Sequence, residues 1–231
     1  MTYLELVNGV LTRLREKKVA SLDTNPFVSL IGALVNDAKQ SVEDAWQWSQ
    51  LRAIESIQVT PNQKNIILPN SSDNTYSIRD ILNVQTGGYL KYVTQPWLRY
   101  WYSDSFNNPL SSGEPTYWTW GPVDNATGNK TLDILKPADT FYTLNVNRVT
   151  NQPMLVSPDD RLWVPYAPVL HLATALASRE RGEIGGTPTS ELFVMADRYL
   201  SDAIAYDSAK WTEEMDWTAD DRLWNTNVGT A

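Results

Sequence analysis

Residues 163–207 read WVPYAPVLHLATALASRERGEIGGTPTSELFVMADRYLSDAIAYD, and this stretch decides how the chain folds. Apolar residues recur every three or four positions on both sides of Gly185-Gly186, which predicts two amphipathic helices joined by a glycine turn. The stretch has no nucleophile beside a base, no set of metal ligands and no phosphate-binding loop. A helical hairpin without such chemistry indicates a part of an assembly, and we expect no enzymatic activity.

The N-terminal residues predict two more helices. Thr2 and Glu5 have the spacing of a capping box, and residues 2–17 predict a helix whose apolar stripe lies at positions 3–14. Asn25 and Pro26 suit the cap and first turn of a second helix, whose stripe runs over 27–46. In the C-terminal part the helix resumes near Asp159 and is expected to be regular only beyond the early prolines Pro165 and Pro168, and the stripes lie at 169–180 and 190–204. We expect all four stripes to face one shared core, as in a four-helix bundle.

The residues between these helical pairs have a different period. Short β-branched segments bounded by Pro and Asn, such as SIQVTPNQKNIILPN, predict strands, and further strand patterns lie at 116–120, 131–136 and 140–147. A short aromatic helix is expected from Thr94 to Tyr102. The sequence thus predicts an α+β fold in which residues 1–51 and 158–210 form the four-helix bundle and residues 52–157 form an inserted β-rich barrel or sandwich. Residues 211–231 show no sustained period and are expected to form an extended C-terminal tail.

Composition excludes several kinds of site. The 231 residues include no Cys and one His, so disulfides, thiolate catalysis and two-His metal motifs are excluded. The formal net charge of −8 argues against a general affinity for nucleic acid, and the densest basic cluster ends a helix, where cations offset the helix dipole. No apolar run has membrane-spanning length and no signal peptide is recognisable, so we expect a soluble protein with no membrane partner.

Four acidic residues and the histidine were weighed as catalytic groups. Asp159 and Asp160 fit the acidic first turn of a helix, and Glu180 and Glu183 fit a solvated helix end. His171 lies among apolar neighbours and suits a buried or inter-subunit contact better than a general base. The sequence therefore predicts no catalytic, cofactor-binding or metal-binding residue.

Aromatic residues are the unusual part of the composition, with 10 Trp and 11 Tyr but only 4 Phe. Two interpretations stay open: a surface for partners or sugars, and the lining of a small β core. The residues concerned are Trp97, Tyr100, Trp101, Tyr117, Trp118 and Trp120. An alternative function is therefore a carbohydrate- or receptor-binding tail component, although the helical half of the chain is atypical of sugar-binding modules. A cell-wall hydrolase is a third possibility that rests on common carboxylates alone.

Two segments resemble a known family. The first is AKQSVEDAWQWSQLRAIESIQVTPNQKNIILPN, at 38–70; the second is the helical pair VPYAPVLHLATALASRERGE and PTSELFVMADRYLSDAIAYD, at 164–183 and 188–207. The chain resembles the head-to-tail connector, or adaptor, proteins of tailed bacteriophages over residues 1 to about 210, particularly the tail tubular A-type gatekeepers of short-tailed phages. The large β insertion and the abundant Trp depart from the smallest members, which leaves open whether the insertion docks to the portal or to the tail.

The resemblance implies a virion structural protein at the head-to-tail interface, made in the host cytoplasm. It implies a ring of identical subunits, commonly twelve, below the portal protein, through which genomic DNA passes without sequence-specific binding. The ring offers a platform for the downstream tail protein, a nozzle or tail tube, and needs no cofactor. In the family the C-terminal segment reaches the portal, so we expect portal contacts from Trp211, Trp217, Leu223 and Trp224, ordered on binding. The alternative is an unstructured terminus without a partner.

Overall fold

The computed structural model describes residues 1–23, 25–69, 71, 76–104, 112–181 and 187–210. The chain divides into two compact units: Met1–Gln50 with Pro153–Ala231, and Leu51–Gln152. The first is the helical unit and the second is the β unit, and the two are described separately below. Together they give the mixed α+β fold that the sequence predicts.

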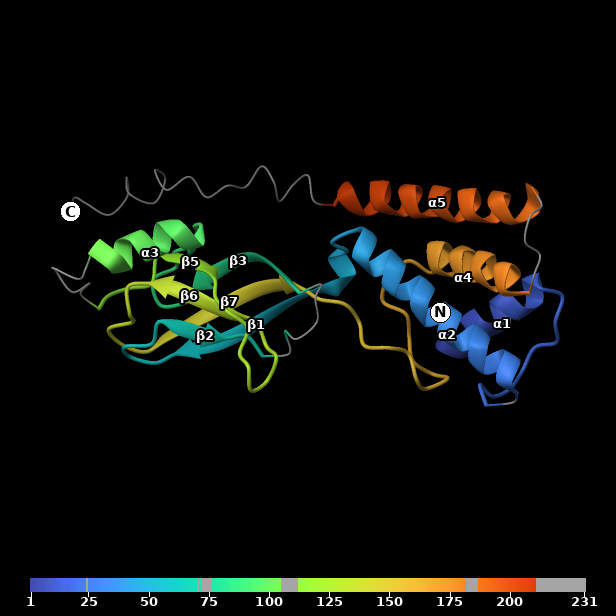
Figure 1. Ribbon diagram of the computed structural model, residues 1–231, viewed down its shortest axis with the longest axis horizontal. Helices are drawn as coiled ribbons and strands as arrows, with labels where there is room; N and C mark the ends of the chain where they lie inside the picture. Colours follow the sequence, from blue (N-terminus) through green and yellow to red (C-terminus); the bar gives the residue numbers. More distant parts are fainter. Residues whose placement is uncertain (24, 70, 72–75, 105–111, 182–186, 211–231) are drawn as a thin grey trace, which may run out of the picture. The chain divides into compact units, whose positions relative to one another are not determined.

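The helical unit contains α1 (Tyr3–Arg13), α2 (Pro26–Ala45), α4 (Tyr166–Glu180) and α5 (Thr187–Ser208) (Figure 1). The predicted capping box is confirmed: Glu5 N donates to Thr2 Oγ1 and Thr2 N donates to Glu5 Oε2. Asn25 Oδ1 accepts the amide hydrogen of Val28 at 2.9 Å, which confirms the predicted start of α2. Both starts are local signals, because cap and helix are sequence neighbours.

Two predicted helix boundaries are wrong. The first helix was expected to continue to Lys17 but ends at Arg13, and Arg15 lies in the left-handed region with φ 60°. The last helical pair was expected to begin near Asp159, but α4 begins at Tyr166. Asp160 Oδ2 instead accepts the amide hydrogens of Val156 and Ser157, both at 2.7 Å, and so closes a turn in an irregular segment.

The four helices do not form the predicted four-helix bundle. Helix α4 contacts α1, α2 and α5, and α1 also contacts α2, whereas the extensive contacts of α5 are with α4 alone. The shared core therefore belongs to α1, α2 and α4, with buried Leu6, Val10, Ile31 and Val35 among its members. Of the predicted α5 stripe, Ala196 is buried, while Met195 is 45 % exposed and Tyr199 is 40 % exposed. An amphipathic stripe marks an apolar face but does not fix how many neighbours cover it.

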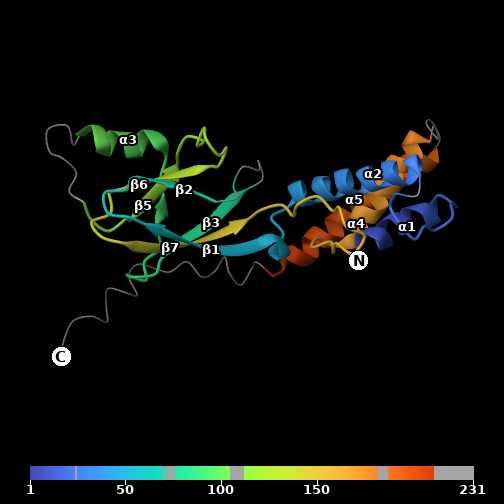
Figure 2. The same cartoon turned by 90° about the horizontal axis from the view of Figure 1, so that it is seen from below.

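The β unit contains two open sheets. Strands β1 (Arg52–Val59), β7 (Tyr142–Val149) and β3 (Ser77–Asn83) form one sheet, in that order, with antiparallel pairing. Strands β2 (Asn65–Ile67), β6 (Thr131–Leu135), β5 (Tyr117–Trp120) and β4 (Lys91–Tyr92) form the other. Helix α3 (Gln95–Asp104) lies on the four-stranded sheet, and a 3₁₀ turn at Ser49–Leu51 leads into β1 (Figure 2).

Both sheets contribute to one hydrophobic core. Ile81, Leu144 and Val146 come from the three-stranded sheet, and Leu132 and Ile134 come from the four-stranded sheet; all five are fully buried. Of the two predicted forms, barrel or sandwich, the barrel is not what the described strands form, because they make two separate open sheets. Alternation of side chains predicts which residues face inward, but closure depends on pairing between strands far apart in sequence.

Candidate functional site

The residues expected to contact the portal, Trp211, Trp217, Leu223 and Trp224, lie outside the described residues. The structure does describe the end of α5, which leads into that segment. Asp207 is 1 % exposed there. Its Oδ2 accepts hydrogen bonds from Trp46 Nε1 at 3.2 Å and from Ser49 N at 2.9 Å, and its Oδ1 accepts one from Ser49 Oγ at 2.6 Å. Lys210 Nζ lies 3.2 Å from the same Oδ1.

This carboxylate ties the end of α5 to the turn that follows α2. Ser49 stands just before the boundary at which the chain enters the β unit. The charge-assisted hydrogen bonds of Asp207 therefore fix, within the helical unit, the points at which this linker and the C-terminal segment leave it. The sequence did not reveal this role, because Asp207 reads as one more polar residue of α5 and Ser49 and Trp46 stand 158 and 161 positions away.

The returning linker is held in the same way. Asn36 Nδ2 donates to Leu155 O at 3.0 Å, and Leu155 N donates to Asn36 Oδ1 at 3.0 Å. Asn36 lies on α2, and Leu155 follows the boundary at which the chain leaves the β unit. Side chains of the helical unit thus hold both linkers near the points where they meet it.

The groups weighed for catalysis do not converge. His171 stacks on Tyr199 with ring centroids 4.3 Å apart, and its pKa is lowered by burial and by the nearby Arg13 charge. Asp160 holds a turn, Glu180 ends α4, and Glu183 lies outside the described residues. In the described part of the chain, no three His, Asp or Glu residues are grouped as metal ligands. None of the described helices is long and apolar enough to cross a membrane.

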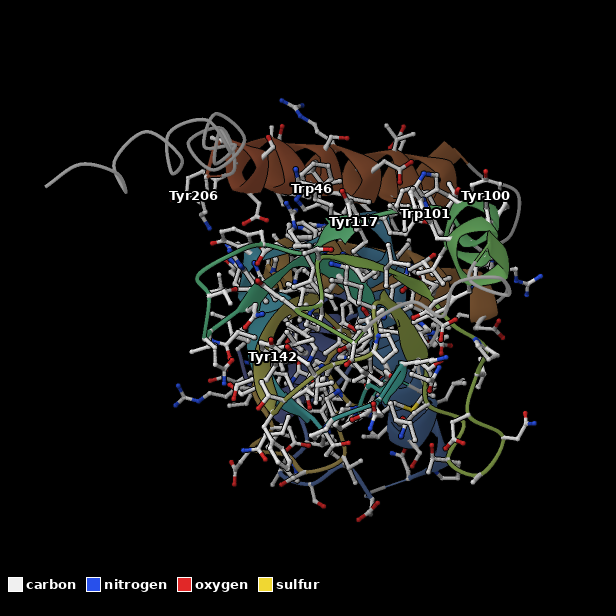
Figure 3. The ribbon with its side chains drawn as sticks, turned by 90° about the vertical axis from the view of Figure 1, so that its left-hand side faces the viewer. Trp46, Tyr100, Trp101, Tyr117, Tyr142 and Tyr206 are labelled. Carbon is white, nitrogen blue, oxygen red and sulfur yellow. The ribbon has the colours of Figure 1, made fainter. Side chains whose placement is uncertain are left out.

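Exposed aromatic rings gather on α3 and β5. Trp97 is 36 % exposed, Tyr100 65 % and Trp101 43 %. Trp97 lies 5.7 Å from Trp101 and 5.1 Å from Tyr117 between ring centroids, and Tyr100 lies 6.3 Å from Trp101. Tyr100, Trp101 and Tyr117 are labelled in Figure 3. We call Trp97, Tyr100, Trp101 and Tyr117 the aromatic surface.

The opposite face of α3 explains why these rings point outward. Leu98 is buried, and Tyr102 Oη donates to Ile134 O at 2.5 Å. Gln95 Nε2 donates to Trp120 O at 2.6 Å and to Asp133 Oδ2 at 3.0 Å. Burial of the Tyr102 hydroxyl, with the Asp133 charge, raises the pKa of Tyr102 to about 12, so it remains a donor at neutral pH. One face of α3 is thus fixed to the sheet and the other carries the aromatic surface.

The core interpretation is confirmed for one subset of the aromatic residues, and for the exposed subset the partner interpretation stays a prediction. Trp118 is 5 % exposed and belongs to the core, and Trp120 packs against that core from the same strand. The aromatic surface supplies the exposed subset. Interplanar angles of 55° for Trp97–Trp101 and 82° for Tyr100–Trp101 show that these rings do not form one flat platform. The surface therefore presents ring edges as well as faces to whatever binds there.

A comparison with protein-family models gives a match over residues 1–215, to the family described as SU10 adaptor protein. The match covers the helices and strands of both units and stops within the C-terminal segment. No curated protein matches the chain. An adaptor family implies a structural component of a bacteriophage virion that contacts other capsid and tail proteins. The chain belongs to the SU10 adaptor protein family, the adaptors that join phage heads to their tails.

Proposed function

We propose that the chain is a head-to-tail adaptor that forms a ring below the portal, extends the DNA exit channel and provides the platform on which the tail attaches. The observation that carries this proposal is the family match, which spans both units up to residue 215. A ring of about twelve copies, as in the gatekeeper proteins that the sequence resembles, matches the cyclic symmetry common in such assemblies. Genomic DNA passes through without sequence-specific binding, which suits a chain of net charge −8.

The C-terminal segment makes the portal contact in this proposal. Residues 211–231 contain three Trp, five acidic residues and one Arg, so they combine large apolar anchors with negative charge. The proposed contacts are Trp211, Trp217, Leu223 and Trp224, and the acidic residues face a basic portal surface. Asp207 supports the arrangement, because it fixes the end of the helix from which the segment leaves.

The proposal assigns one task to each part of the chain. Residues 1–51 and 158–210 form the helical domain that sits at the portal, and residues 52–157 form the domain that carries the aromatic surface. The downstream nozzle or tail-tube protein attaches to the assembled ring. The chain has a structural role in the virion and needs no cofactor for it.

Electron microscopy of the purified protein mixed with its portal tests the proposal. We expect ring-shaped density added to one end of the portal, with the same rotational symmetry along the channel. Portal particles that stay bare at saturating protein concentration would contradict an adaptor role. A portal variant without its channel-end surface serves as the control for non-specific adsorption.

The exposed aromatic rings favour one alternative, a carbohydrate- or receptor-binding tail component. Trp97, Tyr100 and Trp101 could each stack on a sugar face. A glycan array separates the two functions. Binding that is lost in Trp101→Ala, by a protein that does not bind portal, would support the alternative.

A further inference from the structure

Strand β1 is an edge strand of unusual length for an exposed position. It has eight residues and pairs with β7 along its whole length, from Arg52 opposite Val149 to Val59 opposite Tyr142. Strand β7 lies in the middle of the sheet and β3 on its far side. One side of β1 therefore faces away from its own sheet.

The hydrogen-bond pattern identifies the groups on that side. Thr150 N donates to Leu51 O at 3.3 Å, and the register places these two residues opposite each other. Antiparallel pairs alternate between hydrogen-bonded and non-bonded positions. Every second residue after Leu51 consequently bonds β7, while Ile54, Ser56 and Gln58 turn their backbone N–H and C=O groups outward.

The other side of β7 agrees with this assignment. Val84 N donates to Thr143 O at 3.0 Å, so odd-numbered residues of β7 bond the β3 side and even-numbered residues bond β1. Within the part of the chain that the structure describes, no backbone hydrogen bond reaches Ile54, Ser56 or Gln58 from outside the sheet. At Ile54, Ser56 and Gln58, backbone donors and acceptors of β1 thus have no partner among the described residues.

The opposite edge of the sheet is treated differently. Asn83 N donates to Gly88 O and Leu90 N donates to Ile81 O, both at 2.9 Å, and Leu82 forms a bridge with Tyr89. The chain that follows β3 therefore folds back and covers its edge. The described residues provide no such cover for β1.

Strand β1 also has few of the devices that normally protect an open edge, the charged Arg52 at its first residue being the exception. Such edges carry Pro, Lys or outward charges that repel a further strand. Residues 52–59 contain neither Pro nor Lys. Glu55 lies 2.9 Å from Arg148 Nε on the neighbouring strand, at an angle that makes an ion pair rather than a hydrogen bond. Ile54, at 69 % exposure, adds an apolar side chain to the edge.

We propose that the β1 edge pairs with an extended segment of a second copy of this chain, and that this strand addition joins neighbouring subunits. The open N–H and C=O groups match an extended backbone, which neither a sugar ring nor the side of a helix can replace. The inference rests on the proposed ring, and it names where one subunit meets the next.

Charge and stoichiometry select a second copy as the occupant. Each copy carries a net charge of −8, so two copies approach best where charge is absent or compensated. The edge meets that condition over most of its length, because its outward residues Ile54, Ser56 and Gln58 are uncharged and Glu55 is paired with Arg148. The charged residue at its start, Arg52, donates from Nε to Asn147 Oδ1 on the neighbouring strand. Each β1 edge binds one extended segment. In a ring of identical subunits, every subunit can donate one segment to its neighbour and accept one from the other side, so the one-to-one ratio follows from the symmetry.

Photocrosslinking identifies the occupant directly. Ile54→p-benzoylphenylalanine places a photoreactive group at the edge, and Phe141→p-benzoylphenylalanine places one at a position of the same unit that is 63 % exposed. With portal-bound protein, we expect covalent dimers and larger multimers of this chain from position 54 and none from position 141. Adducts of position 54 with portal or tail protein alone, or no adduct at all, would overturn the inference.

Proline provides the second arm. Because Ser56 N points outward, Ser56→Pro removes an edge donor without removing a bond to β7. Ser56→Ala is the matched control, since both variants lose the bond from Ser56 Oγ to Asn145 Oδ1. We expect Ser56→Ala to form multimers like the unmodified protein and Ser56→Pro to form at least tenfold fewer at an unchanged melting temperature. Equal multimers from both variants would overturn the inference. If Ser56→Pro does not fold, the inference is tested by the crosslinking from position 54 alone.

The two proposals fail in distinguishable ways. If the unmodified protein does not bind portal, the proposed function is wrong, and the crosslinking is read on free protein at increasing concentration. Copy-to-copy adducts there would still support strand addition. If portal binding is intact and position 54 yields no copy-to-copy adduct, the β1 inference alone is wrong.

Discussion

In the described part of the chain, the helical unit and the β unit each contain a buried core and an element that is covered on one side. In the helical unit that element is α5, which packs on α4 and leaves Tyr199 and Tyr206 exposed. In the β unit it is β1, which pairs with β7 and whose outer edge is not paired by any described residue. The exposed part is side-chain surface in one case and backbone in the other. Partners of the two units should therefore differ: packed side chains suit α5 and an extended strand suits β1.

The largest expected effect comes from the two cores. Leu144 of β7 and Leu6 of α1 are both fully buried, so Leu→Ala at either position should cost about 3 kcal/mol of unfolding free energy. If the units unfold independently, Leu144→Ala should lower only the transition of the β unit and Leu6→Ala only that of the helical unit. Calorimetry checks this, with Val156→Ala, at a 77 % exposed position, as the control. A single transition that both variants shift equally would break the comparison.

The next effect concerns the hold on α5. Asp207→Ala leaves partly buried donors of Ser49 and Trp46 without their acceptor, which should cost about 1–2 kcal/mol. Hydrogen exchange should rise at the end of α5 and at the turn after α2, while the β unit stays unchanged. Asp202→Ala, on the exposed face of the same helix, is the matched control. Unchanged exchange at Ser49 would show that this contact does not hold the helix end.

A smaller effect is expected where α2 meets α1. A Cβ at Gly32 would lie 2.5 Å from Tyr3 Oη, so Gly32→Ala forces the ring to move. The overpacking cost of about 1–3 kcal/mol should exceed the roughly 0.5–1 kcal/mol that Ala gains over Gly inside a helix, so we expect a net loss of stability. At Gly88 the nearest atom would lie 3.6 Å away, and Gly88→Ala should fit without that displacement. Denaturant unfolding of the two variants checks the difference. Equal unfolding free energies for Gly32→Ala and Gly88→Ala would mean that the Tyr3 ring moves aside without a measurable cost.

The smallest effect is a pH dependence at the contact of α4 with α5. Burial and the Arg13 charge lower the pKa of His171 in the folded state, so the folded protein binds fewer protons there than the unfolded chain. This histidine therefore leaves stability unaffected above about pH 6.5, the unfolded value, and lowers it as the pH falls through that value. His171→Gln should remove that part of the pH dependence. Because His171 is the chain's one histidine, an NMR titration measures its pKa without overlap from other histidines. A pKa in the folded protein at or above the unfolded value would contradict the buried position of His171 against Tyr199.

The elements that sequence predicted correctly are those with local signals. Thr2 with Glu5, and Asn25 with Pro26, start helices through neighbours in sequence, and the aromatic helix after Thr94 was expected for similar reasons. The prediction of four helices around one core was wrong. The periodicity of α5 shows that the helix has an apolar face, but not which other elements pack against that face. The barrel was wrong because closure depends on distant pairing.

The candidate sites divide in the same way. Trp101 and Trp118 occur in similar aromatic runs, yet Trp101 is exposed on α3 and Trp118 is buried on β5. The difference depends on which element each residue belongs to and on whether its side chain points toward the core. Asp207 and the β1 edge depend on contacts between residues far apart in the chain. No local pattern could reveal either of them.

Deletion of residues 211–231 tests the adaptor proposal most directly. Thermal unfolding and co-sedimentation with portal are measured on the same preparation, with the full chain as the reference. Because the described helices and strands end at Ser208, we predict an unchanged melting temperature and loss of portal binding. Full binding by the shortened chain, or collapse of its fold, would contradict the account.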